Sequence, residues 1–279
     1  MNSQITFLVF TFNEESRLEY YLRCIQGWGR IVVIDNYSTD KTLEIASRYT
    51  DQIYKFKNPG YIENKETMGF ALSKVSTPWA YLGYVDELLP RALLEQLTLI
   101  SHENHYKVIE LYRKNFMYGQ EIFNYGKHHL RMFVPDAVDF TGNIVHKLGK
   151  FLVSEDQIYK VPPSEQTSLW HFSSYNTSKL ELVHNRYAEL EALQRHQILG
   201  QKFSGFRALW QLVFYFWGTY LGLGGLRGGW PGLFISVQIA YFKFSIEARL
   251  WEHDQGLSPA AIELRYEQLK EALLKNRNN

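Results

Sequence analysis

Three apolar runs near the start of the chain constrain its fold more than any other feature. They are Ile5–Phe10, Ile31–Ile34 and Trp79–Val85, and none of them alternates apolar with polar residues. A strand of this kind is buried on both faces, which is typical of a parallel sheet. Stretches with helical spacing separate the runs, at residues 18–25, 43–46 and 64–75, and another follows at 90–101. The sequence therefore predicts an α/β fold with helices on both faces of a mostly parallel sheet.

The spacing of apolar residues changes after residue 107. Short strand-like runs at 108–112, 130–134 and 138–141 are separated by polar turns, which predicts antiparallel additions to the edge of the sheet. A long amphipathic helix is expected over 178–199. We therefore predict an α/β domain over residues 1–200 and a C-terminal helical region over 201–279.

The C-terminal region contains an apolar, aromatic segment, Phe203–Glu252, with a glycine-rich centre. Seven of the 15 residues from Gly218 to Gly232 are glycine. This pattern predicts two helices joined by a hairpin. Because tryptophan favours the headgroup level of a bilayer, we expect the hairpin to lie at a membrane surface. A buried helical subdomain or a dimer interface is the alternative.

Charge and cysteine content exclude several classes of function. Thirty Lys and Arg residues against 29 Asp and Glu give a net charge of +1, which argues against nucleic-acid binding. The single cysteine, Cys24, cannot form an internal disulfide, so a reducing compartment is expected. The first apolar run lacks the basic flank of a secretory signal, and no stretch offers 18 clean apolar residues for a membrane span.

Polar residues follow three of the expected strands, and in a parallel sheet such strand ends share one edge, where ligands bind. The clusters are Thr11–Glu15, Asp35–Asp40 and the pair Asp86-Glu87. Any one of them alone is more often a helix cap. All three in one α/β unit predict a binding site. Neither of the first two loops contains a GxGxxG or P-loop pattern, which argues against a Rossmann dehydrogenase or an NTPase.

The motifs ITFLVFTFNEE and IVVIDNYSTDKTLEIA, followed by a Trp-led strand that ends in Asp-Glu, resemble the nucleotide-sugar domain of family 2 glycosyltransferases. The wider layout is similar to the lipopolysaccharide-core branch, glucosyltransferases that act on Kdo or heptose acceptors. The segments that match this branch are Gly60-Tyr61, Ala71-Leu72, Trp79 to Glu87, Asn115-Phe116, Leu130 to Phe133 and the C-terminal hairpin.

The resemblance implies a GT-A fold and a UDP-sugar donor. By this analogy the nucleoside pocket is lined by Thr11, Asn13 and Glu14. Asp35 would accept a hydrogen bond from uracil or ribose. Two further residues are expected at the binding site for the UDP-sugar. Asp40 would hold the loop, and Lys65 would face the diphosphate.

Two departures from the family pattern affect the expected chemistry. The D-x-D motif reads Tyr84-Val85-Asp86, so Asp86 remains as the expected carboxylate ligand of Mg²⁺ or Mn²⁺, with His171 as a possible second ligand. The Val-His-Glu of the branch reads Val145-His146-Lys147. The candidates for the general base are therefore Glu87, which we favour from its position, and Asp139. Lys147 could pair with an anionic acceptor.

We therefore predict an inverting enzyme that moves a sugar from a UDP-sugar to a lipid-linked or lipopolysaccharide-type glycan acceptor. It would work at the cytoplasmic face of a bacterial membrane, as a peripheral protein, either as a monomer or as a homo-oligomer. The alternative is a catalytically impaired relative that serves as a nucleotide-binding or assembly partner in polysaccharide synthesis. A nucleotidyltransferase is disfavoured because no Gly-rich, Arg-bearing loop follows the first strand.

Overall fold

The computed structural model describes residues 4–103, 105–122, 126–141, 148–173 and 175–276. The chain forms two compact units, which we call the sheet unit, residues 1–177, and the helical unit, residues 178–279. The sequence predicted the boundary at residue 200. In the structure the long helix α5 (Thr177–Gln197) belongs almost entirely to the second unit.

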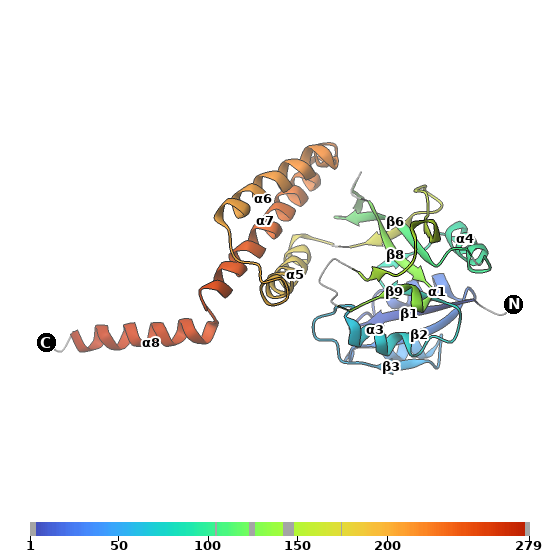
Figure 1. The fold of residues 1–279 in the computed structure, drawn as a ribbon, viewed down its shortest axis with the longest axis horizontal. Coiled ribbons are helices and arrows are strands. Elements are labelled where there is room, and N and C mark those ends of the chain that lie inside the picture. Colours follow the sequence, from blue (N-terminus) through green and yellow to red (C-terminus); the bar gives the residue numbers. More distant parts are fainter. Residues whose placement is uncertain (1–3, 104, 123–125, 142–147, 174, 277–279) are drawn as a thin grey trace. The chain divides into compact units, whose positions relative to one another are not determined.

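Four parallel strands form the first half of the sheet, in the order β3-β2-β1-β4; Figure 1 labels the first three. They are β1 (Ile5–Thr11), β2 (Arg30–Asp35), β3 (Ile53–Lys55) and β4 (Trp79–Tyr84). In this register Thr11 lies beside Asp35 and Phe10 lies beside Tyr84. The three central strands thus end at one edge of the sheet, as predicted for an α/β fold of parallel strands.

The second half of the sheet continues past β4 in the order β8-β6-β12-β5. These strands are β5 (Glu87–Leu88), β6 (Val108–Met117), β8 (Lys127–Phe133) and β12 (Leu169–Phe172); β7 (Gln120–Glu121) and β11 (Ile158–Lys160) also pair with β6, and β9 (Val138–Asp139) forms a separate hairpin with β10 (Lys150–Phe151). β5 begins soon after β4 ends, yet it lies at the far end of the strand order. The sheet therefore curls until its last strand returns to the end of β4.

Helices cover both faces of the sheet. One face carries α1 (Leu18–Ile25), α2 (Thr42–Ser47) and α4 (Arg91–Ser101), and the other carries α3 (Lys65–Leu72). The apolar side chains of α1 recur every three or four residues and are buried against the sheet. The α/β fold class predicted from the sequence is confirmed.

The helical unit contains α5, α6 (Gly205–Trp217), α7 (Gly229–Asp254) and α8 (Pro259–Asn276). Helices α6 and α7 form the predicted hairpin, and a π-helical turn and a 3-10 turn join them. A Cβ on Gly232 would lie 1.9 Å from the carbonyl oxygen of Gly225, so only glycine allows the backbone to close here. One turn of α5 packs against α7 through small and aliphatic side chains.

The α6–α7 hairpin carries many of its large apolar side chains on the outside. The exposed ones are Phe206, Leu209, Trp210, Leu212, Val213, Phe214, Trp217, Leu221, Leu226, Trp230, Phe234, Val237, Tyr241 and Trp251. We call this set the apolar hairpin surface. Within the described residues, every helix is too short or too polar to cross a membrane.

Candidate active site

Asp35 joins the loops that follow β1 and β2. Its carboxylate accepts hydrogen bonds from the Thr11 hydroxyl at 3.0 Å, the Ser38 hydroxyl at 2.5 Å and the Ser38 backbone N–H at 2.9 Å. Asp35 is fully buried and Thr11 nearly so. Both residues lie at the expected strand ends. Their polar atoms bind within the loops, so the contacts of both side chains are to the protein itself.

Asn13 lies on the same pair of loops and has a left-handed backbone conformation, with φ 52°. Asparagine tolerates this conformation better than most residues. The Asn13 side-chain oxygen accepts a hydrogen bond from the Thr39 backbone N–H at 2.8 Å, and its own N–H donates to the Ser38 hydroxyl. The strained turn is thus held from both sides.

Asp40 ties the start of α2 to the loop after β1. It accepts hydrogen bonds from the Thr42 N–H at 2.9 Å, the Thr42 hydroxyl at 2.5 Å and the Glu15 N–H at 3.1 Å. Burial raises the pKa of Asp40, but these hydrogen bonds outweigh it and lower the pKa below the usual value. Asp40 therefore occupies a position that holds the loop.

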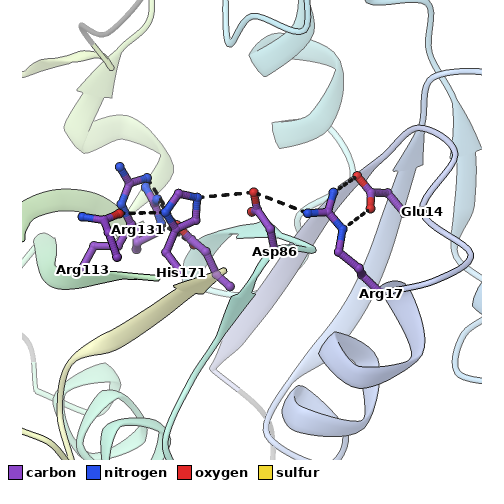
Figure 2. Close-up of polar contacts among 8 residues, drawn as sticks. Glu14, Arg17, Asp86, Arg113, Arg131 and His171 are labelled. Atoms are coloured by element: carbon purple, nitrogen blue, oxygen red, sulfur yellow. Dashed lines mark hydrogen bonds and ion pairs between the residues drawn. The ribbon is translucent and has the colours of Figure 1, made fainter. Parts of the chain in front are cut away.

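Asp86 lies between Arg17 and His171 at the carboxyl edge (Figure 2). On one side Arg17 Nη1 lies 3.9 Å from Asp86 Oδ2, and Arg17 binds both carboxylate oxygens of Glu14. On the other side His171 Nε2 lies 3.3 Å from the same oxygen. Burial raises the pKa of Asp86, but His171 and Arg17 hold it far below its usual range. The side chain keeps 28% of its surface exposed, so a ligand can reach it.

Asn115 on β6 orients the His171 ring. His171 Nδ1 lies 2.8 Å from the side-chain oxygen of Asn115, which can only accept a hydrogen bond. Nδ1 therefore carries the hydrogen, and in the neutral ring the lone pair of Nε2 faces Asp86. Two lone pairs that face each other need a proton or a metal cation between them.

Glu87 does not occupy the open position expected of a general base. Its side chain is 1% exposed, and both carboxylate oxygens accept hydrogen bonds from Arg131, at 2.9 and 2.5 Å. Arg131 is the extra residue of a bulge in β8, which turns its side chain toward Glu87. A substrate hydroxyl therefore has no open path to this carboxylate. We therefore withdraw the preference for Glu87 as the base.

Tyr84 stands where the family pattern has its first carboxylate. Its hydroxyl donates a hydrogen bond to Glu63 at 2.7 Å, and its ring faces the Arg131 guanidinium at 4.8 Å. Burial, together with the charge of Glu63, raises the pKa of Tyr84 well above its usual value. The side chain is therefore a neutral phenol that supports the neighbouring ion pair.

Asp139 and Lys65 have no described contact with Asp86. Asp139 ends β9 and accepts a hydrogen bond from the Thr141 N–H at 2.8 Å, which lowers its pKa, and the Lys65 charge adds to this effect. Lys65 begins α3 and is exposed. His146 and Lys147 lie outside the described residues.

Comparison with known proteins identifies the class of enzyme. The chain is 24% identical over 259 residues to the lipopolysaccharide core biosynthesis glycosyltransferase LpsC of Rhizobium meliloti, covering 88% of this chain and 90% of that one. It is 24% identical over 277 residues to an uncharacterized glycosyltransferase of Rickettsia typhi, covering 89% and 87%. No family model matches. The chain is a glycosyltransferase homologue. The resemblance and the enzyme class predicted from the sequence are thereby confirmed.

Among solved structures, the mannosyltransferase PcManGT from Pyrobaculum calidifontis, in complex with GDP-Man and Mn²⁺, is similar to this glycosyltransferase homologue with a TM-score of 0.46 and 12% identity. The similarity covers 98% of this chain and 81% of that one.

The residues that surround Asp86 in this glycosyltransferase homologue include several that the sequence did not single out. Arg17 lies three residues after Glu14, a spacing at which an ion pair was predictable. Arg113 shares the face of β6 that carries Asn115, a residue of the Asn115-Phe116 segment. No local pattern in the sequence reveals that β12 pairs with both β6 and β5. The positions of Asn115 and Arg113 near Asp86 could therefore be recognised only from the sheet topology.

A divalent cation would be held here by few protein ligands. The described part of the chain contains no cluster of three or more acidic, histidine or cysteine side chains suited to a metal. Asp86 Oδ2 and His171 Nε2 nevertheless face each other with their lone pairs, and the second nitrogen of the ring is fixed by Asn115. This pair fits a Mg²⁺ or Mn²⁺ ion whose other ligands are phosphate oxygens and water.

Proposed function

We propose that the chain is an inverting glycosyltransferase that moves a sugar from a UDP-sugar to a lipid-linked or lipopolysaccharide-type glycan. The observation that carries the proposal is the meeting of three strand ends at one edge, with Asp35 at the end of β2 and Asp86 beyond the end of β4. Ligands of open α/β sheets bind at such an edge. The LpsC relative supports a lipopolysaccharide-type acceptor.

The uridine would lie against the paired loops after β1 and β2. Because Asp35 and Thr11 bind each other and Ser38, they would position this pocket, and the accessible groups of Asn13 and Glu14 would contact the nucleoside. Asp40 would keep the two loops together, and Lys65 would approach the diphosphate from the start of α3.

The leaving diphosphate would lie beside Asp86. A metal ion held by Asp86 and His171 would supply positive charge to the phosphate oxygens as the bond to the sugar breaks. Arg17 would help to orient Asp86, because it binds Glu14 on one side and approaches Asp86 on the other (Figure 2). Asn115 would keep the His171 ring in the tautomer that such binding needs.

The transfer itself would be one displacement at the anomeric carbon. The acceptor hydroxyl oxygen forms a bond to this carbon, the bond from the carbon to the phosphate oxygen breaks, and UDP leaves with the electron pair. The hydroxyl proton passes to a base, which we assign to Asp139 because it is accessible whereas Glu87 is not. Asp139→Asn should lower transfer while UDP affinity stays unchanged, and equal transfer would contradict this assignment.

The acceptor would be reached from a membrane surface that contacts the apolar hairpin surface. Residues 203–246 contain no Asp or Glu, and their charged residues are Arg207, Arg227 and Lys243. Exposed tryptophans flank the glycine-rich turn, at Trp217 and Trp230. Arg207 and Lys243 lie next to Glu247 and Glu191, whereas Arg227 is exposed in the turn. Exposed aromatic rings with an exposed cation between them in the sequence suit a bilayer with anionic headgroups. We therefore place the enzyme at the inner face of a bacterial membrane, as a peripheral protein.

Calorimetric titration tests the donor site. We expect UDP to bind and its affinity to rise when Mn²⁺ is present, with hydrolysis or transfer of the matching UDP-sugar. His171→Ala should remove the metal effect, whereas the exposed His102→Ala should leave it intact. Absence of UDP binding would overturn the proposal. UDP binding without metal enhancement or turnover of any UDP-sugar would favour a nucleotide-binding assembly partner instead.

A further inference from the structure

We propose that Arg113 binds the diphosphate of the sugar-nucleotide donor. The inference rests on the proposed function and deepens it, because it assigns an anion contact beside Asp86 to a residue outside the sequence motifs. It comes from a comparison of the three arginines that surround Asp86 and Glu87, which are Arg17, Arg113 and Arg131 (Figure 2).

Two of these arginines already bind a carboxylate with both arms of the guanidinium. Arg17 donates to Glu14 from Nε at 2.8 Å and from Nη2 at 2.7 Å. Arg131 donates to both oxygens of Glu87 in the same way. Their planar donor groups are thus directed at protein carboxylates and leave little for a ligand.

Arg113 lacks such a partner. Its nearest carboxylate contact joins Nη1 to Glu87 Oε1 at 3.7 Å, which exceeds hydrogen-bond length. Its buried Nε has no hydrogen-bond partner within the described part of the chain. The side chain keeps 25% of its surface exposed, so a ligand can reach part of it.

The neighbouring carboxylates also bind groups other than Arg113. Glu87 carries one negative charge, and Arg131 neutralises it through two hydrogen bonds. Asp86 carries a second negative charge, so Arg131, Arg113, Glu87 and Asp86 are neutral together, but the ion-pair contacts of Asp86 are with Arg17 and His171. Burial lowers the pKa of Arg113, and the Arg131 charge adds to this, although Glu87 and Asp86 oppose it. A poorly solvated cation of this kind is stabilised when an anion binds to it.

The curled sheet places this cation next to the proposed diphosphate position. Arg113 and Asn115 are two residues apart on β6, so their side chains share one face of the strand. Asn115 contacts His171, and His171 contacts Asp86. A guanidinium matches phosphate better than an ammonium group because it can donate two parallel hydrogen bonds to phosphate oxygens. The chemical class of the ligand is therefore a phosphate ester, and the donor's diphosphate is the one that reaches this edge.

Titration of the Arg113→Gln variant with UDP and with uridine tests the contact. We expect UDP affinity to fall at least about tenfold, the loss of a charge-assisted hydrogen bond, with uridine affinity unchanged. The loss should persist in EDTA, because the contact does not pass through a metal. Arg91→Gln is the matched control, since Arg91 is a surface arginine paired with Glu95. It should bind UDP like the unaltered protein.

Folding is not expected to obscure the result, because Glu87 keeps Arg131 as its partner in the variant. Arg113→Lys provides a second test, since it keeps the charge and should lose only part of the UDP affinity. UDP affinity equal to that of the unaltered protein in both variants would overturn the role of Arg113 alone. If a phosphorylated acceptor were the true ligand, the variants would show a raised KM for the acceptor with unchanged UDP binding. That result would also overturn the proposal. Failure of the unaltered protein to bind UDP would overturn the proposed function as well.

Discussion

Each unit of this protein buries a glutamate that binds an arginine through two hydrogen bonds. In the sheet unit the pair is Glu87 with Arg131, and in the helical unit it is Glu247 with Arg207, which joins α7 to α6. The two glutamates are equally buried, but Arg131 is 4% exposed whereas Arg207 is 31% exposed. Arg207 can reach water, and Arg131 cannot.

The apolar side chains around the two ion pairs also differ in exposure. Around Glu87 the apolar side chains are inside the unit and the charged ones gather at the strand ends. Around Glu247 the apolar hairpin surface points outward. The sheet unit thus uses its buried charges to hold a site in place. The helical unit uses one buried pair to hold together a hairpin whose apolar side chains remain available to a partner.

The largest expected effect contrasts the two glutamates. Glu87→Gln leaves Arg131 as an uncompensated buried cation, so the free energy of unfolding of the sheet unit should fall by about 3–5 kcal/mol. Glu247→Gln should cost less, because Arg207 can turn toward water. Urea denaturation gives the loss, and hydrogen exchange assigns it to a unit. Equal losses in the two variants would contradict the comparison.

The next effect concerns Asp86, the accessible carboxylate of the sheet unit. Asp86→Asn keeps the shape of the side chain but removes its charge, so transfer should fall by roughly 10²-fold or more while the urea midpoint changes little. Steady-state transfer to a glycan acceptor gives the first value. Glu95→Gln, on the surface of α4, is the control for a lost carboxylate. Full activity in Asp86→Asn would remove Asp86 from the reaction.

A smaller effect is expected from the apolar hairpin surface. Replacing Trp217 and Trp230 with Ser should weaken binding to vesicles that contain anionic lipid by about tenfold or more, with UDP affinity unchanged. Sedimentation with vesicles measures this, and Tyr20→Ser is the control, because Tyr20 is 65% exposed on the sheet unit. Unchanged vesicle binding would contradict the membrane contact. A switch from dimer to monomer in ultracentrifugation would indicate that the surface contacts a second copy instead.

The sequence predicted the parallel half of the sheet well because burial on both faces leaves a direct mark, as in Ile5–Phe10 and Ile31–Ile34. It also located Asp35 and Asp86 at the strand ends. It could not show that Asp35 is occupied by Thr11 and Ser38, because such hydrogen bonds depend on two loops meeting in space.

The second half of the site was less predictable for a topological reason. The short strands β5 and β12 lie beside each other although about 80 residues separate them in the chain, and neither carries a strong strand pattern. From the sequence, the position of Glu87 after a strand indicated a catalytic role. In the structure, the bulge at Arg131 lets that arginine bind Glu87 in a buried ion pair. On α5 Leu182 is 65% exposed, and the buried residues of that helix are Leu180, Ala188, Glu191 and Ala192.

The smallest expected effect concerns the loop carboxylate Asp40. Its replacement tests whether the stability of the sheet unit depends on a charge outside the core. Asp40→Asn should lower the free energy of unfolding by about 1 kcal/mol near neutral pH. The pKa of Asp40 is lower in the folded state than in the unfolded chain, so this contribution is complete above the unfolded pKa and is lost as the pH falls through the folded pKa. The two proteins should therefore differ at pH 7 and converge toward pH 2 in urea denaturation. A difference that stays constant with pH would mean that Asp40 acts through shape and not through its charge, and the loop would then resemble the helical unit in depending mainly on packing.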